Sequence, residues 1–232
     1  MDGALPDDPE TARAVQGRLR GQVRLEPLDR PVSRVGGVDS AFLTDRVVAV
    51  VVVLRYPELE VVEEAIAALP IPFPYVPGLL SFREGPAILE AFQRLHTLPD
   101  LLLFDGQGIA HPRRLGIASH MGLLLDRPAV GVAKSRLVGT YDAVGLGVEK
   151  GDRVPLMDGG ETLGTVLRSR RNVRPLFVSP GHRCNVTDAV SWTLACCTRY
   201  RLPEPTRIAD KRADVHKRQL RERTDSAPEQ EG

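Results

Sequence analysis

The stretch Asp100-Leu-Leu-Leu-Phe-Asp105 predicts a strand at the centre of a sheet, because it is apolar on both faces and turn residues bound it. A helical pattern at 115–125 separates it from a second short apolar run, Ala129-Val-Gly-Val-Ala-Lys134. Another helix is expected to begin at Pro86, ahead of the first run. The order from 86 to 134 is therefore helix, strand, helix, strand. This order predicts a parallel pair of strands joined by a right-handed crossover, and hence an α/β fold.

The segment before this unit predicts a β-hairpin. Arg34-Val-Gly-Gly-Val-Asp-Ser-Ala-Phe-Leu43 and Val47–Leu54 both favour strands, and a short polar turn separates them. The next segment, 58–69, is ambiguous. Val61 and Val62 favour a strand, whereas the following Glu63-Glu-Ala-Ile-Ala-Ala favours a helix on propensity. The residues alone do not decide between the two.

The rest of the chain is expected to complete one domain, residues 1–223, followed by a disordered tail at 224–232. The elements predicted are a helix opening at Asp8, loops over 140–160, strands over 162–167 and 175–179, a helix over 188–200 with Thr187 as its N-cap, and a last helix that begins after 202–206 and runs toward Arg221.

The composition is that of a soluble globular protein. The chain has 232 residues, of which 42% are hydrophobic and 26% charged, and its net charge of +1 gives no global field for nucleic acid. Its apolar runs are too short to cross a bilayer and its acidic N-terminus lacks a signal-peptide pattern, so we expect a cytoplasmic protein, taken as a monomer. The three cysteines, Cys184, Cys196 and Cys197, lack Cys-x-x-Cys spacing and are expected to be buried thiols.

The stretch Pro74-Tyr-Val-Pro-Gly-Leu-Leu-Ser-Phe-Arg-Glu-Gly-Pro86 predicts a stiff loop that presents an aromatic ring. Prolines restrict the backbone on both sides of Tyr75, so the ring is suited to act as a wedge. Glu84 follows, and with Pro86 as the first helical residue its carboxylate is expected at the entrance of a helix.

Two further carboxylates, Asp39 and Asp105, lie within or directly after apolar strands. Each alone is as readily explained as an exposed or capping acid. If the two strands are neighbours, their carboxylates converge at one end of the sheet and the loop with Glu84 can close over them. Three like charges would raise one another's pKa unless a divalent cation neutralised them. Mg²⁺ is the natural candidate because it prefers oxygen ligands.

This cluster indicates metal-assisted hydrolysis of a phosphodiester. His111, on the loop after Asp105, could move a proton or hold the attacking water, and Lys134 could contact the phosphate; either could equally be a solvated surface residue. Basic residues gather over 168–174 and along the last helix, and they indicate either an ordinary solvated face or contact with a nucleic-acid backbone.

Four segments closely resemble the endonuclease V family of deoxyinosine-specific nucleases, over nearly the whole chain from the first helix to Asp210. They are Pro74-Tyr-Val-Pro-Gly-Leu-Leu-Ser-Phe-Arg-Glu84, Phe104-Asp-Gly-Gln-Gly-Ile-Ala-His-Pro-Arg-Arg-Leu-Gly-Ile-Ala-Ser-His120, Gly131-Val-Ala-Lys-Ser135 and Ser179-Pro-Gly-His182.

The resemblance implies an RNase H-like α/β fold with a mixed sheet, in which an antiparallel hairpin joins parallel strands and helices flank the sheet. It implies a DNA repair enzyme that uses Mg²⁺ or Mn²⁺ and cuts the second phosphodiester bond 3′ to deoxyinosine, leaving 3′-hydroxyl and 5′-phosphate ends. It also favours a strand for 61–67. Two alternatives stay open: cleavage of inosine in single-stranded RNA, and inosine or junction binding without catalysis.

The resemblance also implies roles for individual residues. Asp39, Glu84 and Asp105 would be the metal ligands, with His111 and Lys134 assisting. The strand-separating wedge would be Pro74, Tyr75, Val76 and Pro77, and the pocket for the flipped base would be Gly78, Leu80, Gly106 and Ile117. At the position of Asp210 some relatives carry a histidine that faces the metal, so Asp210 is an auxiliary candidate.

Overall fold

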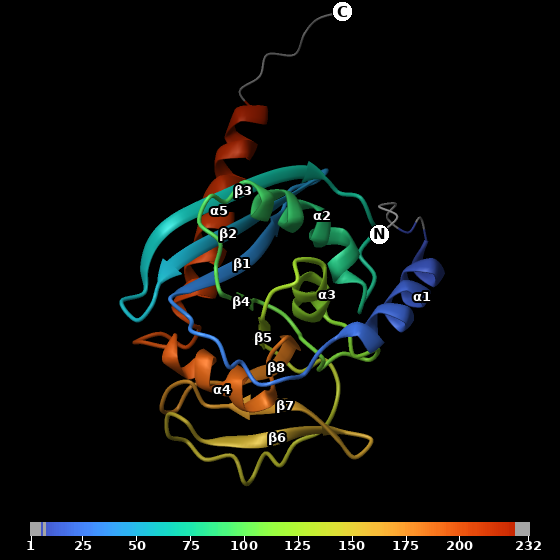
Figure 1. Cartoon of the computed structure of the whole chain (residues 1–232). Helices are drawn as coiled ribbons and strands as arrows, with labels where there is room; N and C mark the ends of the chain where they lie inside the picture. The colour runs from blue at the N-terminus through green and yellow to red at the C-terminus, as the bar shows by residue number, and fades with distance from the viewer. Residues whose placement is uncertain (1–5, 7, 226–232) are drawn as a thin grey trace, which may run out of the picture.

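The computed structural model describes residue 6 and residues 8–225, and its centre is one eight-stranded sheet in the order β3-β2-β1-β4-β5-β8-β7-β6 (Figure 1). β1 pairs in parallel with β4 and β4 with β5, whereas the other pairs are antiparallel. The mixed sheet with a hairpin and parallel strands is therefore confirmed. The strands are β1 Arg34–Phe42, β2 Arg46–Arg55, β3 Glu60–Pro70, β4 Leu101–Phe104, β5 Ala129–Ala133, β6 Arg153–Asp158, β7 Glu161–Leu167 and β8 Leu176–His182.

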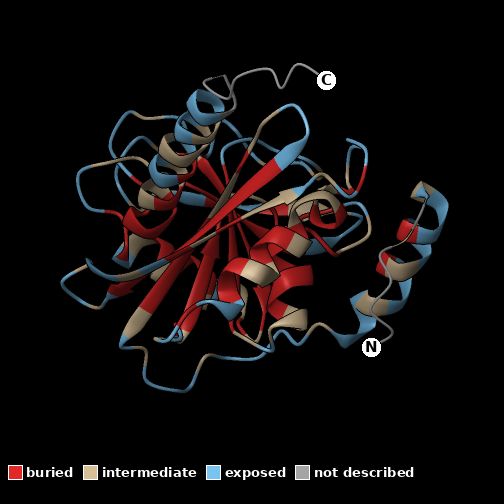
Figure 2. Cartoon of the chain, turned by 90° about the horizontal axis from the view of Figure 1, so that it is seen from above, coloured by how far each residue is buried: buried red, intermediate tan, exposed pale blue. Residues whose placement is uncertain are grey.

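Helices cover both faces of this sheet. α2 and α3 pack with β2, β3 and β4 in one apolar cluster, whereas α4 and α5 pack on the opposite side of the strands. α1 lies against the loop that precedes α2. The buried residues accordingly concentrate in the strands and in the inward sides of the helices (Figure 2). The helices are α1 Pro9–Leu19, α2 Leu80–Gln93, α3 Ile117–Leu124, α4 Val186–Ala195 and α5 Glu204–Asp225, with a short 3-10 helix at Arg20–Gln22.

The central strands are buried on both faces, as their sequences predict. All residues from Val47 to Leu54 in β2 are inaccessible to solvent, and so are Leu101, Leu102 and Leu103 of β4. Burial on two faces requires continuous apolar runs, and this explains why β2 and β4 lack the alternation of a surface strand. Segment 58–69, which propensity left undecided, forms most of β3.

Helix α2 begins earlier than predicted. It starts at Leu80, so Pro86 lies inside it and Glu84 is an internal residue instead of marking the helix entrance. Proline within a helix removes a backbone hydrogen bond and costs about 3 kcal/mol. The first turn compensates by packing, because Phe82 is buried in a cluster with Phe73 and Leu79. The prediction that placed the helix start at Pro86 was therefore wrong.

Two further boundaries also differ. Strand β6 lies within the segment predicted to be loops; Pro155 hid its alternation, and the proline is tolerated because β6 is an edge strand. Helix α4 is capped by Asn185 instead of Thr187, since the Asn185 side chain accepts a hydrogen bond from the Asp188 N–H at 2.8 Å. It ends at Ala195, five residues before the predicted Tyr200.

Three other sequence predictions concern the ends and the thiols. α5 extends to Asp225, and the rest of the predicted tail lies outside the described residues. The three cysteines are free and buried, as expected. No helix in the described part of the chain combines the length and hydropathy needed to span a bilayer. The cytoplasmic location and the single domain stay predictions.

Gly37 of β1 allows α5 to approach the sheet, and we predict that Gly37→Ala destabilises the fold. A Cβ at position 37 would lie 2.0 Å from the Pro205 carbonyl oxygen in the first turn of α5. Relieving this clash must shift backbone, so the free energy of unfolding is expected to fall by about 3 kcal/mol in denaturant titrations. Gly17→Ala in α1 is the control. Nothing lies within 4 Å of a Cβ there, so alanine should stabilise this helix by about 0.5–1 kcal/mol. Equal effects at the two positions would contradict the assignment.

The buried side chain of His120 predicts a loss of stability in acid. Burial lowers the pKa of His120 from 6.5 to about 4, and its Nδ1 lies 2.9 Å from Ser81 Oγ. In the unfolded chain His120 therefore becomes protonated below about pH 6.5, whereas in the folded chain it stays neutral until the pH falls to about 4. The stabilisation by neutral His120 is complete above this window and is lost as the pH falls through it, by up to about 1.4 kcal/mol per pH unit. Urea titrations of the wild type and His120→Gln should differ by this slope. Equal slopes in the two proteins would contradict this account.

Candidate active site

The alternation of side chains along the strands places three predicted residues on one face of the sheet. Val35 of β1, Leu103 of β4 and Val132 of β5 share an apolar cluster on the α4 side. Side chains two residues apart point to the same side of a strand. Asp39 within β1, and Asp105 and Lys134 directly after β4 and β5, continue these rows. Because β1, β4 and β5 run parallel, the three side chains lie at the same edge of the sheet.

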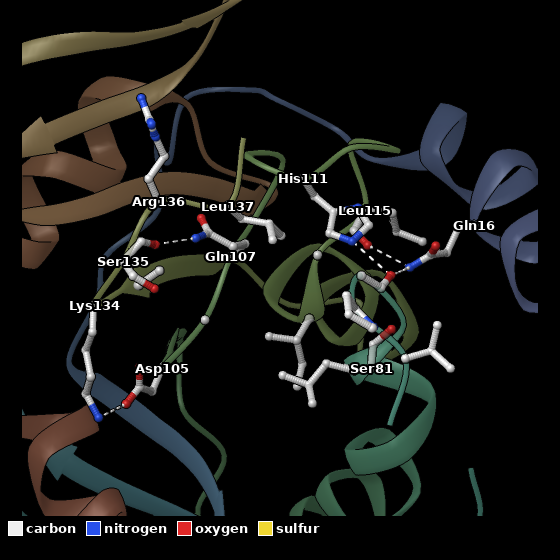
Figure 3. A pocket seen from close by; sticks show the side chains of 18 of the residues that line it. Gln16, Ser81, Asp105, Gln107, His111, Leu115, Lys134, Ser135, Arg136 and Leu137 are labelled. Carbon is white, nitrogen blue, oxygen red and sulfur yellow. Dashed lines mark hydrogen bonds and ion pairs between the residues drawn. The ribbon is translucent and has the colours of Figure 1, made fainter. Parts of the chain in front are cut away.

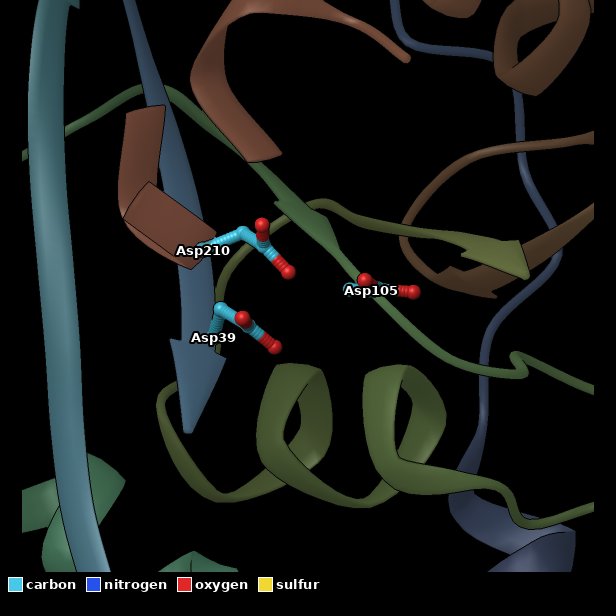
Figure 4. Close-up of side chains that lie close together, drawn as sticks. All are labelled: Asp39, Asp105 and Asp210. Atoms are coloured by element: carbon cyan, nitrogen blue, oxygen red, sulfur yellow. The ribbon is translucent and has the colours of Figure 1, made fainter. Parts of the chain in front are cut away.

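Three carboxylates converge at this edge: Asp39, Asp105 and Asp210 each offer an oxygen, and these oxygens lie within 4.8 Å of one another (Figure 4). Asp210 comes from α5, which crosses the sheet beside β1. The structure thus places Asp210, predicted only as an auxiliary residue, in the closest group of acids. Glu84, predicted as a metal ligand, is not a member of that group.

The electrostatics of the acids show that they form one charged cluster. Burial and the Asp105 charge raise the pKa of Asp39 to about 8. Burial, followed by the charge of Asp39, raises the pKa of Glu84 to about 8 as well. Glu84 therefore lies close enough to feel the cluster from α2. A buried group of like charges is costly unless cations balance it.

Lys134 supplies one positive charge to this cluster. Its ammonium forms ion pairs with Asp105 Oδ2 and, at 3.2 Å, with Asp210 Oδ1. Arg201 holds the strand end in place, because its Nη2 donates to the Lys134 carbonyl oxygen at 3.1 Å. Lys134 was predicted as a phosphate contact, whereas Arg201 was not among the residues singled out from the sequence.

The three acids fit a hard divalent cation. Their donor atoms are all carboxylate oxygens, and the group contains no histidine or cysteine among the described residues. Oxygen donors suit magnesium, calcium or manganese and disfavour softer metals. The cluster therefore forms a candidate metal-binding site with a partly exposed cation, Lys134, beside it.

A pocket of about 410 Å³ adjoins the acids (Figure 3). Its volume is that of a site for a small ligand or a single base. Asp105 and Lys134 line it on one side, and Tyr75 and His111 also contribute. All four residues predicted to hold a base are in the lining: Gly78, Leu80, Gly106 and Ile117. The pocket also includes Val76 and Pro77 of the predicted wedge, whereas exposed Pro74 lies outside its lining.

Two of the pocket glycines have steric reasons to be glycine. Gly78 has a φ of 78°, and a Cβ there would lie 2.9 Å from Arg113 Nη2. At Gly106 a Cβ would lie 2.6 Å from Cγ2 of Ile117, which also lines the pocket. The absence of a side chain at both positions therefore leaves the backbone directly exposed to the pocket.

His111 lies away from the three acids, on the wall beside Gly78. The side chain is 3% exposed, and burial lowers its pKa to about 4. Its Nε2 lies 2.9 Å from the Gly78 carbonyl oxygen, and its Nδ1 accepts the Arg113 N–H at 3.2 Å. Both ring nitrogens thus have partners within the protein. In this arrangement neither ring nitrogen of His111 is free for the proton transfer predicted for it.

Tyr75 projects from the rim of the pocket and is 70% exposed, which is high for a large aromatic side chain. No apolar cluster includes it, although its neighbour Val76 packs against Phe73 and Leu79. The loop is therefore anchored while the ring is left in solvent. This is the presentation that the flanking prolines predict.

Comparisons with known proteins identify the family. The endonuclease V family profile matches residues 17–211. Endonuclease V of Nostoc punctiforme is 53% identical over 217 residues, which cover 92% of this chain and 97% of that protein. The crystal structure of endonuclease V from Streptomyces avermitilis superimposes with a TM-score of 0.88 at 44% identity, covering 97% of this chain and 98% of that one.

A third structure contains nucleic acid. Endonuclease V of Ciona intestinalis, in complex with a 24-mer DNA containing an inosine followed by a ribo-adenosine, has a TM-score of 0.80 at 28% identity. The match covers 92% of this chain and 100% of that chain. These likenesses, together with the mixed sheet, confirm the predicted RNase H-like fold. The family profile, the sequence relatives and the solved structures agree, and the protein belongs to the endonuclease V family.

Proposed function

We propose that this protein is a divalent-metal-dependent DNA repair endonuclease that recognises deoxyinosine and hydrolyses the second phosphodiester bond on its 3′ side, leaving 3′-hydroxyl and 5′-phosphate ends. One observation carries the proposal: a single pocket of about 410 Å³ joins the four predicted base-binding residues to Asp105 and Lys134. The inosine-containing DNA bound by the Ciona intestinalis relative supports the substrate.

Mg²⁺ is the proposed cofactor, and Mn²⁺ is expected to replace it. Asp39, Asp105 and Asp210 would hold the cation, with Glu84 completing the charge of the site from α2. When bound, the cation would supply an activated water and offset the charge that develops on the phosphate. The all-oxygen donor set and the raised pKa of Asp39 and Glu84 both support a site that requires added positive charge.

The chain's own groups position the substrate. Lys134 lines the pocket, so its ammonium is placed to leave Asp210 and contact a phosphate oxygen. Hypoxanthine offers an O6 acceptor and an N1–H donor, whereas adenine offers the reverse pattern. Backbone groups near Gly106, and those of the Gly78 turn other than its bonded carbonyl oxygen, are suited to read this difference, because no side chain of their own separates them from the pocket.

Exposed Tyr75 is proposed to separate the strands and support the gap left by the flipped base. Extruding a base costs a few kcal/mol, and the cost is lowest at a weak or mismatched pair. A rigid aromatic loop at the rim lowers this cost by stacking on the exposed neighbours. Cationic residues of α5 lie on the same side of the sheet as the acids and are proposed to contact the DNA backbone.

The direct test is cleavage of matched oligonucleotides. A labelled duplex with one deoxyinosine, the same duplex with adenine, and a single-stranded RNA with one inosine are each incubated with Mg²⁺ and with Mn²⁺. We expect the deoxyinosine strand to be nicked at the second phosphodiester bond on the 3′ side of the lesion. The downstream product should carry a 5′-phosphate. Preferential cutting of the RNA would reassign the substrate. Tight binding without cleavage in either metal would instead support a non-catalytic binder.

A further inference from the structure

The Gly78 carbonyl oxygen accepts hydrogen bonds from three side chains at one wall of the pocket (Figure 3). Gln16 Nε2 lies at 3.0 Å and His111 Nε2 at 2.9 Å. Arg113 Nη2 donates at 2.8 Å. A carbonyl oxygen has two lone pairs, so three donors saturate it. These three hydrogen bonds therefore fix the loop that carries Gly78 at its carbonyl oxygen.

The network fixes which atoms donate. Gln16 Oε1 accepts from Arg113 Nε, and Gln16 Nε2 donates to the Leu115 carbonyl oxygen at 3.2 Å as well as to Gly78. A flipped amide would set Oε1 against two carbonyl oxygens and Nε2 against a guanidinium, so the orientation of Gln16 follows from its partners. His111 accepts at Nδ1 from the Arg113 N–H, which leaves its proton on Nε2 facing Gly78.

Gln16 lies on the face of α1 that is directed toward the pocket walls. Its side chain is 1% exposed and lies one turn after buried Ala12 on the inward face of the helix. A glutamine at such a position costs free energy unless its amide is fully bonded. All of its amide partners are residues of the pocket walls or of the loop behind them, so the helix gains contact with the pocket through this one side chain.

The two carbonyls that Gln16 joins belong to separate segments of the pocket. Gly78 ends the loop that presents Tyr75, whereas Leu115 precedes α3 and is followed by Gly116 and Ile117 in the lining. Gln16 is thus a link between two walls that are distant in sequence. Discrimination by base-edge hydrogen bonds requires a fixed distance between walls, because a displacement of 1 Å breaks such bonds.

We infer that Gln16 is a positioning residue for base recognition: it holds the Gly78 and Leu115 walls at the separation that admits hypoxanthine and rejects adenine. The inference rests on the proposed function and assigns the selectivity of the pocket partly to the first helix, which contributes nothing to the acid cluster. Gln16 itself was not among the residues singled out from the sequence.

The test compares Gln16→Leu and Gln16→Glu with Gln22→Leu. Leucine removes every amide bond. Glutamate has the same shape and keeps an acceptor for Arg113, but it cannot donate to the two carbonyls. Gln22 is exposed in the segment after α1, so Gln22→Leu is a matched control. The affinity for the adenine duplex, which is not expected to be cut, is measured by fluorescence anisotropy, and single-turnover nicking of the deoxyinosine duplex is measured against enzyme concentration. This separates the half-saturating concentration from the maximal rate.

Both Gln16 variants are expected to raise the half-saturating concentration for deoxyinosine about tenfold or more. The maximal rate and the affinity for the adenine duplex should stay within a few-fold of wild type, since the acids are untouched. Gln22→Leu should behave as wild type. Wild-type behaviour of Gln16→Glu would overturn the inference, because the carbonyl bonds would then be dispensable. So would an equal loss of affinity for both duplexes.

Hydrogen exchange in the DNA-free protein gives a readout that is independent of the substrate. Peptides covering 74–80 and 115–117 should exchange faster in Gln16→Leu than in wild type, whereas peptides of the β-sheet should not. Unchanged exchange at both segments overturns the inference whatever the protein cuts. A wild-type protein that fails to prefer deoxyinosine, with exchange altered as expected, would instead overturn the proposed function.

Discussion

Asp105→Asn is expected to lower nicking of a deoxyinosine duplex by about a thousandfold or more while the fold stays intact. Asp105 is the acid that both belongs to the group within 4.8 Å and lines the pocket. Asparagine keeps the shape but replaces a charged ligand oxygen with a neutral one, and a cation contributes several kcal/mol to such a reaction. Mn²⁺ affinity, measured by titration calorimetry, should fall with the activity.

The same substitution should leave stability in metal-free buffer unchanged or slightly raised. Asp105 contributes to the raised pKa of Asp39, so removing its charge relieves repulsion among the buried acids, which offsets the loss of its ion pair with Lys134. Asp45→Asn is the control, because the Asp45 side chain is 77% exposed and pairs only with Arg46 at 3.7 Å among the ion pairs of the described chain. A variant at 105 that cuts like wild type would remove Asp105 from the site; a variant that unfolds would show that the loss of activity is structural.

Tyr75→Ala and Glu84→Ala are expected to impair different steps: the first DNA binding and the second metal binding. Tyr75→Ala should weaken binding to the deoxyinosine duplex by about tenfold to a hundredfold, the range for loss of base stacking. Its nicking should fall in proportion and its Mn²⁺ affinity should be nearly unchanged. Glu84→Ala should retain lesion binding and lose at least about tenfold in metal affinity, because it removes a carboxylate whose pKa is raised by burial and by the neighbouring charge of Asp39.

Tyr75→Phe separates the ring from its hydroxyl and is expected to keep wild-type nicking. Because Tyr75 is 70% exposed, neither Tyr75 variant should change the unfolding temperature. Binding and metal affinity are measured separately, by fluorescence anisotropy of a labelled duplex and by calorimetry. Identical profiles for Tyr75→Ala and Glu84→Ala would contradict the division of roles within residues 74–86.

The centre of the fold could be predicted because its signals are local. The run at 101–104 is apolar on both faces and bounded by turns, and only a buried central strand suits it. The same reasoning located Asp105 and Lys134, since each directly follows such a strand. The resemblance supplied the pocket residues, all four of which line one pocket.

Segment 58–69 was undecidable locally because its partners are distant. The carboxylate of Glu63 accepts the Thr97 N–H at 2.6 Å, and Glu64 pairs with Arg212 at 2.9 Å. These long-range bonds, with the ladder to β2, override the helix propensity of the glutamates. No pattern within the segment encodes them.

Asp210 and Gln16 show two other limits. Asp210 reaches the acids only because α5 lies against Gly37, a packing detail that depends on the whole fold. Gln16 did give a signal in the sequence: it is a polar residue on the otherwise apolar face formed by Ala12 and Val15. A polar residue in an apolar stripe predicts a buried, bonded side chain, although its partners cannot be named from the sequence.

The contribution of Asp210 by α5, which follows every pocket residue in the sequence, has a consequence for biosynthesis. The ribosome completes every pocket residue, from Gln16 to Leu137, before it adds Asp210. A nascent chain can therefore assemble the walls of the base pocket while one of its three clustered acids is still missing. Because translation proceeds from the N-terminus, the residues that would bind the base are synthesised before the acid cluster needed for cleavage is complete. A chain stalled before α5 would lack the complete acid cluster.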